Sequence, residues 1–201
     1  PKTPKPLSKI CKFLQKGNLI EKAKEKAKTS KYWENWWRVY GLGLQGSLEG
    51  VIFSNWQTID TLPKEARLLG VGLDFGYSND PTAIIEIYKY NDTRILHEVV
   101  YRTGMVNNDI SKYLPKEIPV YADSAEPKSI EEIKRSGIGN IKGVTKGRDS
   151  INFGIQIMLQ QNYLVTSQST NLIKEFRNYT WDIDKNGVRL NKPIDAFNHA
   201  I

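Results

Sequence analysis

After residue 67 the hydrophobic positions switch repeatedly between strand-like and helical spacing, as in a chain that alternates strands with helices. Three consecutive stretches have the apolar run or alternation of a strand, at 68–74, 82–90 and 94–101, and a turn precedes the third. Helices and shorter strands then alternate: helix 107–113, strand 119–122, helix 126–136, strand 140–144, helix 150–161, strand 163–166 and helix 169–178. This order predicts an α/β fold with a mixed sheet flanked by helices.

The two ends of the chain carry other patterns. Residues 7–31 have weak helical spacing. The aromatic-rich run 32–40 is either a short helix held to a core by its rings or a platform on which bases stack. Near the other end, 184–187 predict a hairpin turn, and Asp195 is predicted to begin a final helix.

The net charge of +7 belongs to one part of the 201-residue chain. Residues 1–31 carry ten lysines and two glutamates, whereas the rest carries 19 basic and 20 acidic side chains. The basic segment fits a nucleic-acid contact and also a solvated helix or tail. The single cysteine excludes a disulfide framework and a Cys-rich zinc module. No long apolar run is present, so we expect neither a membrane span nor a secretory signal.

Acidic residues follow two of the predicted strands. Asp74 ends the strand 68–74, and Asp123 follows the strand 119–122. At the carboxyl edge of a sheet two such carboxylates repel each other unless a divalent cation neutralises both, and Mg²⁺ accepts one or two carboxylates beside waters and substrate phosphates. The alternative is a turn residue or helix cap, the role that we assign to Asp80 and Asp149.

Two more groups of residues are candidates for the same site. Asp195 and His199 are four residues apart, which places them on one face of the predicted final helix, although a lone histidine is more often an ordinary surface or core residue. Basic residues near the strand ends are either phosphate contacts or a solvated charge run: Lys128, Lys142, Lys146 and Arg148.

Several ordered motifs resemble one family, the nuclease domain of the large terminase subunit of tailed bacteriophages. Residues 69–83 resemble its first catalytic motif and 121–130 its second. Further blocks are similar in the same order: 37–43, 146–151, 178–181 and 193–201. The resemblance covers about residues 32–201.

The resemblance implies a ribonuclease-H-like fold and an endodeoxyribonuclease that cuts concatemeric viral DNA during genome packaging, by two-metal phosphodiester hydrolysis with Mg²⁺ or Mn²⁺. Asp74 and Asp123 match the family's first two metal-binding carboxylates, and His199 matches its histidine. The third carboxylate would fall just past Ile201, which leaves the metal site incomplete, with Asp195 as a partial substitute.

The resemblance also implies domains and partners. Residues 1–60 would be a basic leader and linker from a missing ATPase half, and 61–201 the nuclease domain. We expect no ATPase activity, because Ser47 follows Gly46 where a phosphate-binding loop needs lysine. The implied partners are double-stranded DNA, the ATPase half, the portal and the small terminase subunit, in the cytoplasm of an infected bacterium.

Two other classes of function fit parts of the same sequence. The residues 73–76 also resemble the phosphate-binding strand of actin-like and sugar-kinase ATPases, which would make the protein a phosphotransferase. A docking module for DNA or a portal, with no catalysis, is the other alternative. ATP-dependent turnover indicates the phosphotransferase, and metal-dependent cutting of plasmid DNA indicates the nuclease.

Overall fold

The computed structural model describes residues 25, 28, 50–145, 147, 149–185 and 187–201. The backbone contacts divide the chain into two units, Pro1–Gly50 and Val51–Ile201. The division falls after Gly50 rather than after residue 60, because residues 56–59 form a strand of the second unit's sheet. The aromatic run 32–40, and the basic leader except residues 25 and 28, lie outside the described residues.

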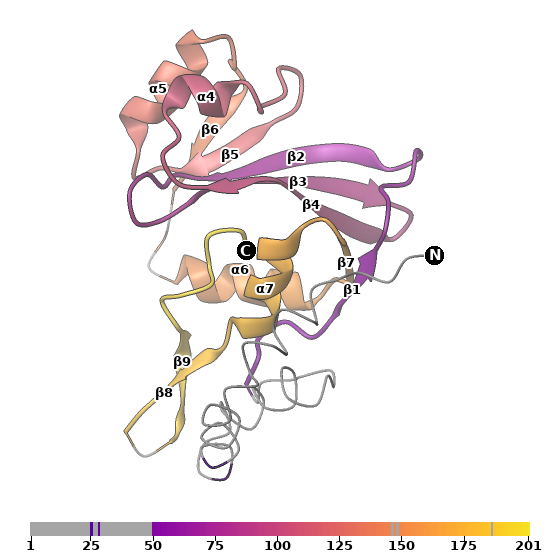
Figure 1. The fold of residues 1–201 in the computed structure, drawn as a ribbon, viewed down its shortest axis with the longest axis vertical. Coiled ribbons are helices and arrows are strands. Elements are labelled where there is room, and N and C mark those ends of the chain that lie inside the picture. Colours follow the sequence, from indigo (N-terminus) through magenta and orange to yellow (C-terminus); the bar gives the residue numbers. More distant parts are fainter. Residues whose placement is uncertain (1–24, 26–27, 29–49, 146, 148, 186) are drawn as a thin grey trace, which may run out of the picture. The chain divides into compact units, whose positions relative to one another are not determined.

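A seven-stranded mixed sheet forms the centre of the second unit, in the order β1-β7-β4-β3-β2-β5-β6 (Figure 1). Its strands are β1 (Trp56–Ile59), β2 (Arg67–Asp74), β3 (Thr82–Tyr90), β4 (Thr93–Arg102), β5 (Val120–Asp123), β6 (Ile141–Val144) and β7 (Tyr163–Thr166). β2, β3 and β4 pair antiparallel, whereas β5, β6, β7 and β1 join in parallel. The predicted mixed sheet is confirmed; β1, with only two apolar residues of four, was not predicted.

Helices cover both faces of this sheet (Figure 1). α4 (Asn107–Ser111) and α5 (Pro127–Arg135) pack on one face, and α6 (Ser150–Leu159) and α7 (Thr170–Asn178) on the other. Side chains alternate across a strand, so β3 supplies both cores: Ile84 to the α4–α5 side, and Ala83 and Ile85 to the α6–α7 side. The apolar content of β3 follows from burial on both faces.

The chain after α7 forms a separate hairpin and then an irregular segment. β8 (Trp181–Ile183) and β9 (Arg189–Pro193) pair antiparallel, which confirms the predicted hairpin. The predicted final helix from Asp195 is wrong, because residues 194–201 form bends instead. Phe197 has a left-handed φ of 59°, and the backbone N–H groups of residues 199 and 200 donate to a side chain of α7 rather than to the preceding turn.

None of the helices in the described part of the chain is both long and apolar enough to cross a membrane.

Candidate active site

The two carboxylates predicted at strand ends lie on neighbouring strands. β2 and β5 pair in parallel, with Leu73 opposite Ala122, so Asp74 and Asp123 each occupy the next position. Leu73 and Ala122 belong to the core on the α4–α5 side. Because successive side chains alternate, both carboxylates project from the opposite face, at the same edge of the sheet. The sequence hypothesis required this juxtaposition.

Asp123 also has the local role that the alternative interpretation assigned to it. Its Oδ1 accepts a hydrogen bond from the Ala125 N–H at 3.1 Å, which shapes the turn into α5. One carboxylate oxygen thus fixes the side chain to its own loop, an arrangement that limits the orientations available to the other oxygen.

The loop after Asp74 folds back sharply over its own start. A Cβ at Gly76 would collide with the carbonyl oxygens of Asp80 and Pro81. The Thr82 hydroxyl donates to the Gly76 carbonyl at 2.6 Å and closes the loop at the beginning of β3. This path brings Asp80, for which the sequence predicts only a turn role, back toward the strand end that carries Asp74.

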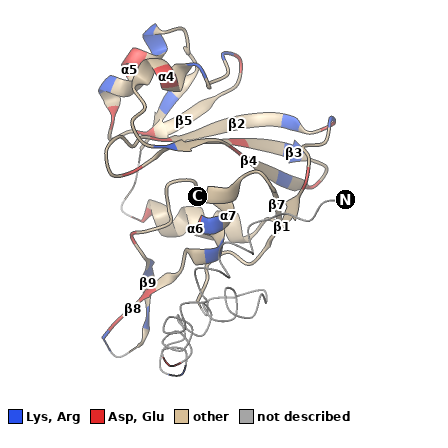
Figure 2. Cartoon of the chain, in the orientation of Figure 1, with Lys and Arg blue, Asp and Glu red and all other residues tan. Residues whose placement is uncertain are grey.

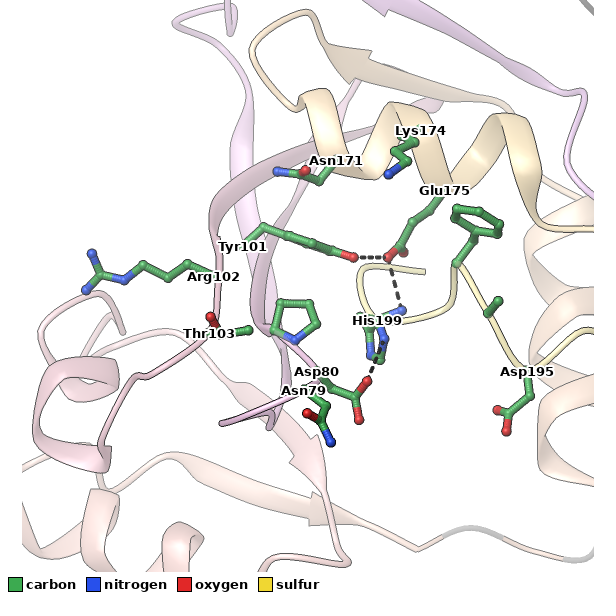
Figure 3. A pocket seen from close by; sticks show the side chains of 13 residues that line it. Asn79, Asp80, Tyr101, Arg102, Thr103, Asn171, Lys174, Glu175, Asp195 and His199 are labelled. Carbon is green, nitrogen blue, oxygen red and sulfur yellow. Dashed lines mark hydrogen bonds and ion pairs between the residues drawn. The ribbon is translucent and has the colours of Figure 1, made fainter. Parts of the chain in front are cut away.

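His199 lies between two carboxylates. Its Nδ1 is 3.2 Å from Asp74 Oδ2, a hydrogen-bond distance, and its Nε2 is 3.6 Å from Asp80 Oδ1. Figure 3 shows the imidazole directed at Asp80. The His199 and Asp74 side chains are 25% and 35% exposed, so solvent and a ligand can both reach the pair.

A buried glutamate lies behind the histidine. Glu175 of α7 is 1% exposed and accepts a hydrogen bond from the Tyr101 hydroxyl at 2.7 Å (Figure 3). Burial, the Glu175 hydrogen bond and nearby negative charges, among them Asp74, raise the pKa of the Tyr101 hydroxyl, so Tyr101 remains a neutral donor.

These groups line a hollow of about 530 Å³. Its polar lining comes from the loop after β2, the end of β4, α7 and the irregular C-terminal segment, and includes Asn79, Asp80, Tyr101, Arg102, Lys174, Glu175, Asp195 and His199. The expectation that Asp195 and His199 share a helical face is wrong, since the segment is not helical. Both line the hollow, but in Figure 3 the Asp195 carboxylate points away from His199.

Comparison with known proteins identifies the fold and the family together. A family model described as the terminase RNAseH like domain matches residues 74–201, which is more than half of the chain and includes every acidic or histidine candidate named above. The chain belongs to this family.

Relatives from bacteriophages agree with this terminase assignment. The large terminase subunit of Bacillus phage SPP1 is 31% identical over 139 residues, which cover 65% of this chain and 33% of that protein. The chain therefore spans about a third of the length of this curated relative.

Solved terminase structures have the same fold. The crystal structure of the SPP1 large terminase nuclease domain with bound Mn is similar at a TM-score of 0.62 and 25% identity, over 73% of this chain and 91% of that one. A large terminase from a thermophilic bacteriophage (TM-score 0.58, 20% identity, 83% and 48% covered) and the P22 nuclease domain (0.52, 16%, 75% and 87%) share the fold. The expected ribonuclease-H-like fold and terminase family are thus confirmed.

Sequence reasoning missed two residues of this terminase site, for different reasons. Glu175 lies on the buried stripe of α7 with Leu172, Phe176 and Tyr179, at spacings of three, four and seven, so the helical pattern carried a signal for an inward-facing carboxylate. Asp80 carried no such signal, because only the folded loop brings it to His199.

The predicted basic contacts of the terminase domain are spread around the strand edge. Lys142 of β6 is exposed and shares a sheet face with Asp123, since it pairs with Tyr121, two residues before Asp123. Lys128 is exposed on α5, on the other side of the sheet. Figure 2 shows basic positions on α5 and α7. Lys146 and Arg148 lie outside the described residues.

The donor set at the strand ends suits a hard divalent cation. Asp74 and Asp123 offer carboxylate oxygens, the ligands that Mg²⁺ and Mn²⁺ prefer, and Mg²⁺ characteristically needs only one or two of them. Among the described residues, no group of three or more His, Cys, Asp or Glu side chains is arranged as a metal cage. The terminase domain thus offers a two-carboxylate site rather than a closed one.

Proposed function

We propose that this chain is a metal-dependent endodeoxyribonuclease that cuts concatemeric viral DNA during genome packaging. The observation that carries the proposal is the pairing of Asp74 and Asp123 at the carboxyl ends of adjacent parallel strands, on one face, with the His199 imidazole 3.2 Å from Asp74. Membership of the terminase family and the manganese bound to the SPP1 nuclease domain support the same activity.

Asp74 and Asp123 would hold Mg²⁺ or Mn²⁺, in one or two positions. The bound metal would activate a water molecule and stabilise the leaving oxygen of the phosphodiester. His199 orients the Asp74 carboxylate through its contact with Oδ2, and Asp80 faces the other imidazole nitrogen. Asp195 is assigned a minor role, because its carboxylate points away from this group (Figure 3).

The substrate and partners follow from the same proposal. Double-stranded DNA would cross the strand edge, with Lys142 on the carboxylate face as a phosphate contact and Lys128, Lys146 and Arg148 as further candidates. The ATPase half of a large terminase, the portal and the small terminase subunit are the proposed partners. The proposed location is the cytoplasm of the infected bacterium.

Plasmid nicking with Mn²⁺ or Mg²⁺ tests the proposal. Asp74→Asn and Asp123→Asn are each expected to abolish cutting while the circular dichroism spectrum stays unchanged. His199→Ala is expected to reduce it by about 10–100-fold, as when a group that orients a metal ligand is removed.

Asp92→Asn is the matched control, since Asp92 is an exposed carboxylate at the opposite end of the same strands. It is expected to cut like the unaltered protein. Undiminished cutting by both Asp74→Asn and Asp123→Asn would refute the nuclease assignment.

A further inference from the structure

Glu175 is a carboxylate in an unusual setting, because it lies inside the α6–α7 core rather than on the surface. A buried charge is costly unless hydrogen bonds replace its lost hydration. Glu175 receives three such bonds. Its Oε1 accepts from the Tyr101 hydroxyl at 2.7 Å and the His199 N–H at 3.3 Å, and its Oε2 accepts from the Ala200 N–H at 2.7 Å.

Two of these bonds fasten a segment that regular secondary structure does not hold. Residues 194–201 are bends, and the positive φ of Phe197 turns the chain just before His199. The consecutive N–H groups of His199 and Ala200 both point at one carboxylate. The backbone from which the imidazole projects is therefore held by Glu175.

The glutamate is itself held by the sheet. The Tyr101 hydroxyl reaches it from β4, and the first turn of α7 is fixed to the same strand by Glu98, whose Oε2 accepts from the Leu172 N–H at 2.7 Å. β4 thus fixes α7 at its start through Glu98 and one turn later through Tyr101. The chain of contacts runs from β4 through Glu175 to the backbone of residue 199.

We propose that Glu175 is a positioning residue of this site, which acts through the backbone of His199 and Ala200 to hold the imidazole between Asp74 and Asp80. The proposal rests on the proposed function only for its effect on DNA cutting. Glu175 does not touch the reacting atoms. Its effect on His199 is a property of the folded chain and is measured without metal or DNA.

Glu175→Gln is the informative variant, because it keeps the size of the side chain. A glutamine has one acceptor oxygen, so at least one of the three donors then faces an amide NH₂ and loses its partner. An unsatisfied buried donor favours local opening. Tyr101→Phe removes one donor and keeps both oxygens for the two backbone N–H groups, so a smaller effect on His199 is expected.

The measurement is NMR of the imidazole nitrogens and backbone amides in EDTA. The chain has only two histidines, so a His97→Gln variant assigns the His199 ring signals. In Glu175→Gln we expect shifted His199 ring signals and amide exchange at residues 199 and 200 faster by on the order of tenfold or more. Plasmid cutting is expected to fall in parallel, with a lower kcat rather than a higher KM for DNA.

Glu98→Gln is the matched control, since it weakens the start of α7 without touching the C-terminal segment. It is expected to lower stability and leave the His199 signals unchanged. Unchanged His199 signals and exchange in Glu175→Gln, or equal changes in Glu98→Gln, would overturn the proposal.

Two further results keep the test decisive. If Glu175→Gln does not fold, Tyr101→Phe decides: faster exchange at residues 199 and 200 supports the proposal, and unchanged exchange overturns it. Failure of the nuclease assignment itself is recognised separately, by undiminished cutting in the Asp74 and Asp123 variants, and does not alter the NMR result.

Discussion

Gly76 shows how a single residue shapes the candidate site. The loop from Asp74 to Thr82 is so tight that the space of a side chain at Gly76 is taken by the backbone oxygens of Asp80 and Pro81. Those oxygens belong to the main chain and cannot rotate away. The requirement is therefore for the absence of a Cβ, and it links the positions of both acidic residues that face His199.

Gly76→Ala is accordingly expected to displace the loop that carries Asp80. Overpacking of this kind costs about 1–3 kcal/mol, and the displaced loop should also lower metal-dependent cutting. Urea unfolding and plasmid nicking measure the two effects. Gly154→Ala is the control: Gly154 lies inside α6 with open space around it, so this change should raise stability by about 0.5–1 kcal/mol. Equal stability changes in the two variants would contradict the steric account.

At the scale of elements, α7 connects the core to the site. Its Leu172 and Phe176 are fully buried, and Glu175 lies between them in sequence and reaches the C-terminal segment. The Phe176 ring packs against the rings of Phe53 and Trp56, at centroid distances of 5.4 and 5.5 Å. One face of a single helix thus supplies both hydrophobic burial and the carboxylate that holds His199.

Phe176→Ala should therefore cost about 3–5 kcal/mol of stability, the usual loss for a fully buried aromatic side chain. The exposed Phe153 of α6 provides the comparison, since it is 65% accessible and its change to alanine should stay within about 0.5 kcal/mol. Chemical denaturation followed by tryptophan fluorescence measures both. Similar losses for the two phenylalanines would contradict the assigned core.

At the scale of the whole molecule, buried tyrosines make stability depend on pH. Burial is the largest cause that raises the pKa of four tyrosines above the ordinary value of 10.0: Tyr88, Tyr101, Tyr163 and Tyr179. In the unfolded chain these hydroxyls lose their protons near pH 10, before they do so in the folded chain. The unfolded state then binds fewer protons, so stability falls as pH rises above about 10.

The urea midpoint should thus be highest below pH 10 and decline from about pH 10 upward. Tyr163→Phe should decline less steeply, because it removes one hydroxyl whose pKa burial raises. Far-ultraviolet circular dichroism across pH 8 to about 11 measures the midpoint. A midpoint that rises over this interval would have the wrong sign for the tyrosine account.

The strands and helices of the second unit could be predicted because burial leaves a period in the sequence. β3 begins and ends where the alternation does, and α5 follows its proline and ends before a glycine. β1 could not be predicted, because only pairing with β7 makes Trp56–Ile59 a strand. The final helix was predicted wrongly, because the N–H groups of residues 199 and 200 find a tertiary acceptor in Glu175.

The sequence by itself determined the alternation of elements, the carboxylates after two strands and the family motifs, since these depend on neighbours along the chain. The tertiary structure decided that Asp74 and Asp123 share one edge and one face, that Asp80 returns to His199, and that Glu175 holds the last residues. The physical reason is range. Periodicity and turn chemistry act over a few residues, whereas Glu175 and Ala200 meet across 25 residues, and Asp74 and His199 across 125.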